Sequence, residues 1–287
     1  MTVGCPPSMT DTTELVVPRS IPMILPIKFR NLLAYLRPDG PLLLLTFSVL
    51  LSSFPASSPM IGAEILVAAA ADLALAGPAL GDAFHRVSGD TVRYAFGGSG
   101  ALARQIESGA PFDLYLSANE RFVRDLAGRN RVIPESVFVY ALGRLGLWSK
   151  SGKYQAVSDL GQPGVRYLAL PNPALAPYGV AAREFLETQK IWAAIEPKIV
   201  YGENVLQAMQ FAESGNADAV ITAWSLVKTR GGVLLPEGGH RPVRQTGAVV
   251  RTARQPAAAG RFLKFLGGAE GRGVLESFGF AAAVRGN

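Results

Sequence analysis

The chain has 287 residues, of which 49% are hydrophobic and 17% charged. It can therefore form one large domain or two smaller ones, and wholesale disorder is excluded. Its formal net charge is +6, but the basic residues are scattered, without a basic run interleaved with aromatic residues. This distribution lacks the concentrated positive surface of nucleic-acid-binding proteins. We therefore predict no nucleic-acid partner.

Cysteine and histidine are scarce. The single cysteine, Cys5, lies in a segment that we expect to be removed, which leaves a mature chain without thiols, suited to an oxidising compartment. The two histidines, His85 and His240, are far apart in the sequence. They cannot supply the three or four converging ligands of a metal site, so we predict neither a metal cation nor a cofactor.

Residues 1–63 have the features of an export signal. Basic residues precede an apolar run at 41–51, and small residues follow at 52–53 and 56–58 and again at Gly62 and Ala63. A positive region, a short apolar region and a small residue at the exit make up a secretory signal, and the run is shorter than the about 20 residues that span a bilayer. We predict a signal peptide over 1–63, with translation starting at Met23 as a hypothesis, and a periplasmic mature chain from Glu64.

From Glu64 onward, short apolar runs alternate with amphipathic stretches, as in α/β proteins. The run at 65–70 is apolar throughout, which is typical of a strand buried on both faces. Asp72 follows as the predicted N-cap of a helix over 73–87, in which Pro78 predicts irregular first turns. The next predicted elements are a strand at 92–96, a turn at 97–100, a helix at 101–108, a strand at 113–117 and a helix at 120–127.

A long apolar-rich stretch at 137–149 is predicted to pass between two lobes. The elements predicted after it are strand 166–170, turn 171–173, helix 179–189, strand 198–201, helix 203–214, strand 219–223, strand 247–251, and helices 257–266 and 270–278. The last strand and the last two helices are predicted to return to the first lobe. We therefore predict two α/β lobes joined by crossing strands, with lobe 1 formed by 64–145 and 246–287 and lobe 2 by 146–245.

Four predicted strand-to-helix junctions are unusual because small or polar residues leave their backbone N–H groups accessible. They lie at 70–72, 97–100, 176–179 and 203–205. In open α/β sheets, ligands bind beyond the carboxyl ends of strands, at helix N-termini. Such a terminus carries roughly half a positive charge, so several of them directed at one point can hold an anion without Lys or Arg.

Each junction also has an ordinary structural interpretation. The Gly-Ser segment can be a simple turn, because glycine readily adopts positive φ, and Tyr178 can be an aromatic residue that only packs in the core. Enzyme motifs do not fit: Ala101 occupies the last glycine position of G-x-S-x-G, and no lysine completes a phosphate-binding G-x-x-x-x-G-K-[ST] loop. Neither His85 nor His240 lies in a turn of catalytic character. We predict a binding protein and no enzyme. The alternative of an enzyme on the same scaffold has only Asp72 as its base.

The segments 97–118, 172–179, 202–205 and 278–280 closely resemble periplasmic molybdate-binding proteins, and the similarity keeps the same order through 64–283. The run R-Q-I-E-x-G-A-P-F-D-L is its most specific part. The resemblance implies a two-lobed type II periplasmic-binding fold, with a hinge, that closes on molybdate or tungstate. It also implies an ABC importer whose membrane permease receives the ion. We expect a monomer, with a phosphate- or sulfate-like oxyanion as the alternative cargo.

The resemblance also implies a set of site residues. Ser99 matches the serine of the second loop, Tyr178 a residue that gives a backbone N–H in the third loop, and Val205 the backbone donor of the fourth loop. Ala71 and Asp72 complete the predicted molybdate-binding site at the first loop. In the family, backbone N–H groups and neutral hydroxyls hold the ion, without a charged partner.

Two positions depart from the family. Ala223 stands where some members have a tyrosine in the late strand, and we expect the Tyr178 hydroxyl to replace it from the opposite side. Asp72 stands where many members have serine, and a carboxylate near a dianion is repulsive. We expect its side chain to cap its own helix, so that only its N–H faces the ligand. The alternative is that Asp72 accepts a hydrogen bond from a protonated oxyanion such as hydrogen phosphate.

Overall fold

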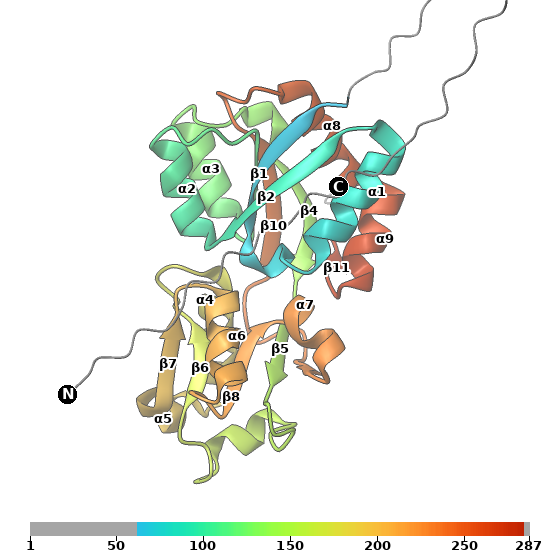
Figure 1. Ribbon diagram of the computed structural model, residues 1–287. Helices are drawn as coiled ribbons and strands as arrows, with labels where there is room; N and C mark the ends of the chain where they lie inside the picture. Colours follow the sequence, from blue (N-terminus) through green and yellow to red (C-terminus); the bar gives the residue numbers. More distant parts are fainter. Residues whose placement is uncertain (1–61, 284–287) are drawn as a thin grey trace, which may run out of the picture. The chain divides into compact units, whose positions relative to one another are not determined.

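The structure is a computed structural model that describes residues 62–283. The predicted export signal, with Cys5 and Met23, therefore falls outside the described residues except for its last two positions. Among the residues described, no helix is both long enough and apolar enough to cross a membrane. The strands of this part form two sheets, which are drawn in Figure 1.

The first sheet contains the strand predicted at 65–70 in its interior. Its strands follow the order β11-β4-β10-β3-β1-β2. Their bounds are β1 Glu64–Ala70, β2 Thr91–Gly97, β3 Leu114–Ser117, β4 Phe138–Gly143, β10 Val243–Val249 and β11 Ala281–Ala282. β1 runs parallel to β2 and β3, whereas β10 is antiparallel to β3 and β4. Since β1 and β2 are parallel neighbours, the loops that follow them meet at one edge of the sheet.

Helices cover both faces of the first sheet, as the continuous apolar run predicts. One face packs against α1, α8 and α9 and the other against α2 and α3, and Figure 1 shows the two groups on opposite sides of β1 and β2. Ile65 and Val67 belong to the first core and Ala68 to the second, because successive side chains of a strand point to opposite faces. The bounds are α1 Ala76–Ser88, α2 Ser99–Glu107, α3 Glu120–Gly128, α8 Pro256–Leu266 and α9 Ala269–Ser277.

The second sheet has the strand order β7-β6-β8-β5-β9. The strands are β5 Leu145–Trp148, β6 Leu168–Pro171, β7 Ile199–Gly202, β8 Ala219–Ala223 and β9 Val233–Leu234, and the helices of this part are α4 Pro177–Thr188, α5 Trp192–Ile195, α6 Val205–Ser214 and α7 Trp224–Val227. β6 is parallel to β7 and β8, whereas β5 is antiparallel to β8. Alanines of the first sheet's loops, among them Ala71 and Ala118, belong to the same apolar core as this sheet.

The chain crosses between the sheets twice. β4 ends at Gly143 and β5 begins at Leu145, so the first crossing takes place at Arg144; the second lies between β9 and β10. The prediction of two α/β lobes joined by crossing segments is therefore confirmed. The predicted lobe boundaries describe which segments move together as rigid bodies, and they stay a prediction.

Most predicted elements differ from the observed bounds by one or two residues, and two of them begin three or more residues away from the predicted position. A 3-10 turn at Ala71–Leu73 precedes α1, which begins at Ala76 rather than directly after Asp72. The irregular first turns expected from Pro78 are thus confirmed. The strand predicted at 247–251 begins earlier, because β10 includes Gln245 and Thr246. These polar residues interrupt the apolar pattern in the sequence, yet both are fully buried.

Candidate functional site

The four unusual junctions meet at one small pocket. All five predicted site residues line it, namely Ala71, Asp72, Ser99, Tyr178 and Val205. β1 and β2 end at this pocket, and the 3-10 turn, α2, α4 and α6 begin there. Parallel strands of both sheets thus direct helix N-termini to the same point, as the strand-end rule predicts.

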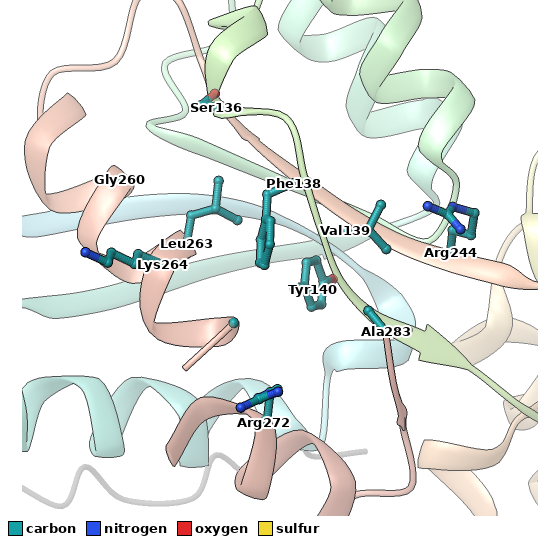
Figure 2. A pocket seen from close by; sticks show the side chains of 11 residues that line it. Ser136, Phe138, Val139, Tyr140, Arg244, Gly260, Leu263, Lys264, Arg272 and Ala283 are labelled. Carbon is teal, nitrogen blue, oxygen red and sulfur yellow. The ribbon is translucent and has the colours of Figure 1, made fainter. Parts of the chain in front are cut away.

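This pocket is too small for an organic ligand. Its volume is about 10 Å³, whereas pockets for organic ligands usually have ~300–1,000 Å³. A larger pocket of about 770 Å³ lies elsewhere, between β4 and the helices α8 and α9 (Figure 2). It contains none of the predicted site residues, and apolar side chains such as Phe138 and Leu263 line it. The small pocket is therefore the candidate site.

Ser99 supplies a hydroxyl donor at the start of α2. Its side chain is 2% exposed, and its Oγ accepts the Ala118 N–H at 3.1 Å. Its carbonyl oxygen accepts the Tyr115 hydroxyl at 2.7 Å, which holds the loop in place. Because a serine hydroxyl has one proton to donate and has used only its acceptor capacity here, that proton can be directed to a ligand.

Val205 supplies a backbone donor at the start of α6. The side chain of Asn204, the N-cap, accepts the Leu206 N–H at 2.9 Å and the Gln207 N–H at 3.1 Å. The Val205 carbonyl oxygen accepts the Thr222 hydroxyl at 3.0 Å, which ties the helix to β8. This cap satisfies the second and third N–H groups of the helix and leaves the first, that of Val205, for the pocket.

Tyr178 lies in the first turn of α4, directly after Pro177. Because proline has no N–H, the first backbone donor of this helix is Tyr178 itself. Its hydroxyl, however, donates to Asp72 Oδ2 at 2.8 Å. A Cβ at Gly143 would lie 2.1 Å from this hydroxyl oxygen, so glycine is needed where the tyrosine ring approaches β4. The expectation that the hydroxyl replaces the family's late-strand tyrosine is untested, and in this structure Asp72 accepts it.

Asp72 does not cap its own helix, so that expectation is wrong. Neither the 3-10 turn nor α1 has a side-chain cap. Instead, Asp72 Oδ2 accepts hydrogen bonds from the Tyr178 hydroxyl and, at 2.6 Å, from Gln245 Nε2. The carbonyl oxygen of Asp72 also accepts the Ser225 hydroxyl at 2.7 Å. The physical reason is that α1 begins only at Ala76, so Asp72 is not at its N-cap position, and donors from two distant segments reach the carboxylate.

The surroundings of Asp72 disfavour its charge. The side chain is 1% exposed, and burial raises its pKa to about 6, although the hydrogen bonds from Tyr178 and Gln245 and the backbone N–H groups of Asp72 and Leu73 act in the opposite direction. Burial and the neighbouring charge of Asp72 raise the pKa of Tyr178 well above its ordinary value. The tyrosine is therefore a neutral donor near pH 7.

The sequence interpretation missed Gln245 and Ser225. Ser225 follows the carboxyl end of β8, and the rule applied to the other four junctions selects it too. Gln245 carries a weaker signal, a polar residue just before an apolar strand. Only the pairing of β10 with β4 shows that it is buried and faces Asp72.

The pocket contains no positively charged side chain. Of the residues lining it, Asp72 alone is ionisable apart from the phenol of Tyr178. Throughout 62–283, no group of three or more His, Cys, Asp or Glu residues has the arrangement to hold a metal ion. The site therefore offers helix N-termini and the Ser99 hydroxyl as donors, which is the chemistry of an oxyanion site.

Comparison with known proteins places the chain in a family. Residues 65–281 match the family model described as "Bacterial extracellular solute-binding protein". The chain belongs to this family. The predicted class of protein, a solute-binding protein and not an enzyme, is thereby confirmed.

Individual relatives of this solute-binding protein have a common description. It is 33% identical over 228 residues to the molybdate-binding protein ModA of Rhodobacter capsulatus, covering 77% of this chain and 90% of that protein. It is 31% identical to ModA of Azotobacter vinelandii, covering 76% of this chain and 90% of the relative. The solved periplasmic molybdate-binding protein of Azotobacter vinelandii superimposes with a TM-score of 0.71 and 26% identity, over 77% of this chain and 100% of that chain. The predicted two-lobed periplasmic-binding fold is confirmed.

Proposed function

We propose that this solute-binding protein captures molybdate outside the cytoplasm and delivers it to the membrane permease of an ABC importer. The observation that carries the proposal is the convergence of three helix N-termini and the Ser99 hydroxyl on one small pocket without a cation. The descriptions of the relatives from Rhodobacter capsulatus and Azotobacter vinelandii support molybdate as the cargo.

Neutral donors are sufficient for a useful affinity. A hydrogen bond to a charged group contributes ~1.5–3 kcal/mol, and a micromolar dissociation constant corresponds to about −8 kcal/mol. The donors we propose are the Ser99 hydroxyl and the backbone N–H groups of Ala71, Asp72, Tyr178 and Val205. Five such bonds reach that requirement in the upper part of this range, where part of the gain can also offset the dehydration of the ion.

Binding is proposed to couple to closure about a hinge. The loops with Asp72 and Ser99 follow strands of the first sheet, whereas Tyr178 and Val205 begin helices of the second part. An ion that contacts all four loops binds the closed arrangement better than an open one and so favours closure. The moving bodies we propose are the predicted lobes, 64–145 with 246–287 and 146–245.

The choice among tetrahedral oxyanions is proposed to depend on size and protonation. Tungstate has the same charge and nearly the same size as molybdate, so we expect both to bind. Sulfate is smaller, which leaves donors too far from its oxygens. Hydrogen phosphate carries a proton that needs an acceptor, and Asp72 is the only carboxylate lining the pocket.

We also propose that residues 1–63 direct export to the periplasm and that the mature protein acts as a monomer. N-terminal sequencing of the exported protein is expected to begin at Glu64. Light scattering of that protein is expected to give the mass of one chain. A different first residue or a stable dimer contradicts the corresponding proposal.

A thermal-shift series with molybdate, tungstate, sulfate and phosphate tests the cargo. A ligand present at 100 times its dissociation constant stabilises the folded state by ~2.7 kcal/mol. We expect such stabilisation at micromolar molybdate or tungstate and none at equal sulfate. If neither molybdate nor tungstate stabilises the protein, the proposed function is wrong.

A further inference from the structure

One carboxylate oxygen of the site has no partner. Asp72 Oδ2 accepts two hydrogen bonds, from Tyr178 and Gln245, whereas Asp72 Oδ1 is buried without a hydrogen-bond partner among the described residues. The side chain is 1% exposed and lines the pocket. Burying a charged oxygen without a hydrogen-bond partner destabilises the folded protein. Such an atom is rare in folded proteins and suggests a functional reason.

The groups around Asp72 do not neutralise it. α4 contributes Tyr178, β10 contributes Gln245, α7 contributes Ser225 and β4 contributes Tyr140, which donates to Gln245 Oε1 at 3.3 Å. Of these only the two tyrosines can titrate, and burial raises the pKa of both well above the ordinary value. No lysine, arginine or histidine is among the groups that shift the Asp72 pKa.

A dianion in this pocket makes an ionised Asp72 still less favourable. Two like charges that are close together and shielded from water repel strongly. The repulsion disappears when the carboxyl group takes up a proton, and its free oxygen then becomes a donor. The two hydrogen bonds to Oδ2 fit this state, because the carbonyl oxygen of a carboxylic acid is an acceptor.

We propose that Asp72 binds a proton together with the oxyanion, so that the carboxyl group is neutral in the loaded site and donates a hydrogen bond from Oδ1 to an oxygen of the ion. This inference rests on the proposed function. The proton comes from solvent, the anion keeps both of its charges, and no other bond forms or breaks. Asp72 then sets both the pH dependence of capture and the preference for fully deprotonated ions.

The ligand-free protein starts from the ionised form at neutral pH. Burial raises the pKa of Asp72 to about 6, so most of the carboxyl groups are ionised at pH 8 and most are protonated at pH 5. Proton uptake on binding should therefore approach one per molybdate at pH 8 and fall toward zero at pH 5. By linkage, the affinity should decrease about tenfold per pH unit above neutrality.

Isothermal titration calorimetry of the full chain with sodium molybdate measures this uptake directly. The titration is repeated in buffers of different ionisation enthalpy, and the slope of observed enthalpy against that value gives the number of protons bound. The variant Asp72→Asn places an amide N–H where the acid proton would be and keeps an acceptor for Tyr178 and Gln245. We expect it to bind molybdate with zero uptake and with an affinity that does not change from pH 6 to pH 8.

Asp113→Asn is the matched control. Asp113 is also buried, but it accepts the N–H groups of Leu66, Arg254 and Gln255 away from the pocket. We expect this variant to retain the proton uptake of the wild type. A thermal-denaturation curve of each variant verifies that it is folded.

The outcomes separate this inference from the proposed function. Molybdate binding without proton uptake at pH 8, or uptake that persists in Asp72→Asn, overturns the role of Asp72 and leaves molybdate capture intact. Preferential binding of phosphate that is lost in Asp72→Asn also overturns it, because the carboxylate is then an acceptor. An absence of molybdate binding in the wild type contradicts the proposed function instead.

Discussion

The two sides of the pocket are built in different ways. On the α6 side, the site is formed by adjacent residues. Asn204 caps the helix, and the N–H of the next residue, Val205, remains available to a ligand. On the Asp72 side, three segments far apart in the sequence converge, since Tyr178 and Gln245 both donate to one carboxylate oxygen. The first side is neutral and local, whereas the second is ionisable and long-range.

This difference separates two properties of the site. Backbone donors at a helix start do not titrate, so the α6 side attracts an anion equally well at any physiological pH. A buried carboxyl group changes its charge with pH and with the occupant of the pocket. The α6 side thus selects anions as the class of ligand. The Asp72 side makes the affinity depend on pH and on the protonation state of the ligand.

The largest effect is expected from removing the charge on the Asp72 side. Burial raises the pKa of Asp72 from 3.8 to about 6, so the stability that this group contributes is complete below the unfolded-state value and is lost as pH rises through about 6. Two pKa units correspond to ~3 kcal/mol. We expect ligand-free Asp72→Asn to be more stable than the wild type by up to ~3 kcal/mol at pH 8, and equally stable near pH 4.

Urea denaturation of both proteins between pH 4 and pH 8 measures this difference. Asp113→Asn is again the control, and we expect it to lose stability because the three backbone N–H groups lose a charged acceptor. If Asp72→Asn is less stable than the wild type at pH 8, the ionised carboxylate stabilises the fold. The prediction that the buried charge of Asp72 destabilises the ligand-free protein is then wrong.

A smaller effect is expected on affinity from Ser99, the neutral donor that shares the Asp72 side. Ser99→Ala removes one hydrogen bond to the anion, worth ~1.5–3 kcal/mol, so molybdate affinity should fall by roughly tenfold or more. Calorimetry at one pH measures the change, and proton uptake should stay as in the wild type.

Ser117→Ala is the comparison for this prediction. Ser117 is fully buried, and its hydroxyl donates to the Asn119 carbonyl oxygen rather than lining the pocket. We expect a loss of stability with little change in affinity. An unchanged affinity in Ser99→Ala removes this hydroxyl from the set of donors.

The same contrast explains what the sequence could predict. The order of elements and the four junctions follow from local patterns: an apolar run such as 65–70, then small residues, then a helix. These patterns place Ser99 and Val205 at strand-to-helix junctions, and the structure brings both to one pocket. The capping prediction for Asp72 also used local rules, and it failed because residues 106 and 173 positions away supply its partners.

Gln245 shows the limit most clearly. Its neighbours Arg244 and Thr246 are polar, so the sequence indicates a loop where β10 begins. Burial of this segment results from pairing with β3 and β4, which lie more than a hundred residues earlier in the chain. The local pattern of apolar residues contains no information on such long-range pairing. The buried polar cluster of Asp72, Tyr178 and Gln245 could therefore not be predicted.

The smallest effect is expected on the local, neutral side. Asn204→Ala removes the side chain that accepts the Leu206 and Gln207 N–H groups, and loss of such a cap costs ~1 kcal/mol. Asn204→Ser should recover most of that stability, because serine also caps helices well, and thermal denaturation of the three proteins measures the series. The affinity for molybdate should fall only slightly at every pH, since the Val205 N–H does not bond to the cap. A pH-dependent loss of affinity in Asn204→Ala would instead show that the two sides of the pocket are coupled, and that the neutral side also responds to the charge on Asp72.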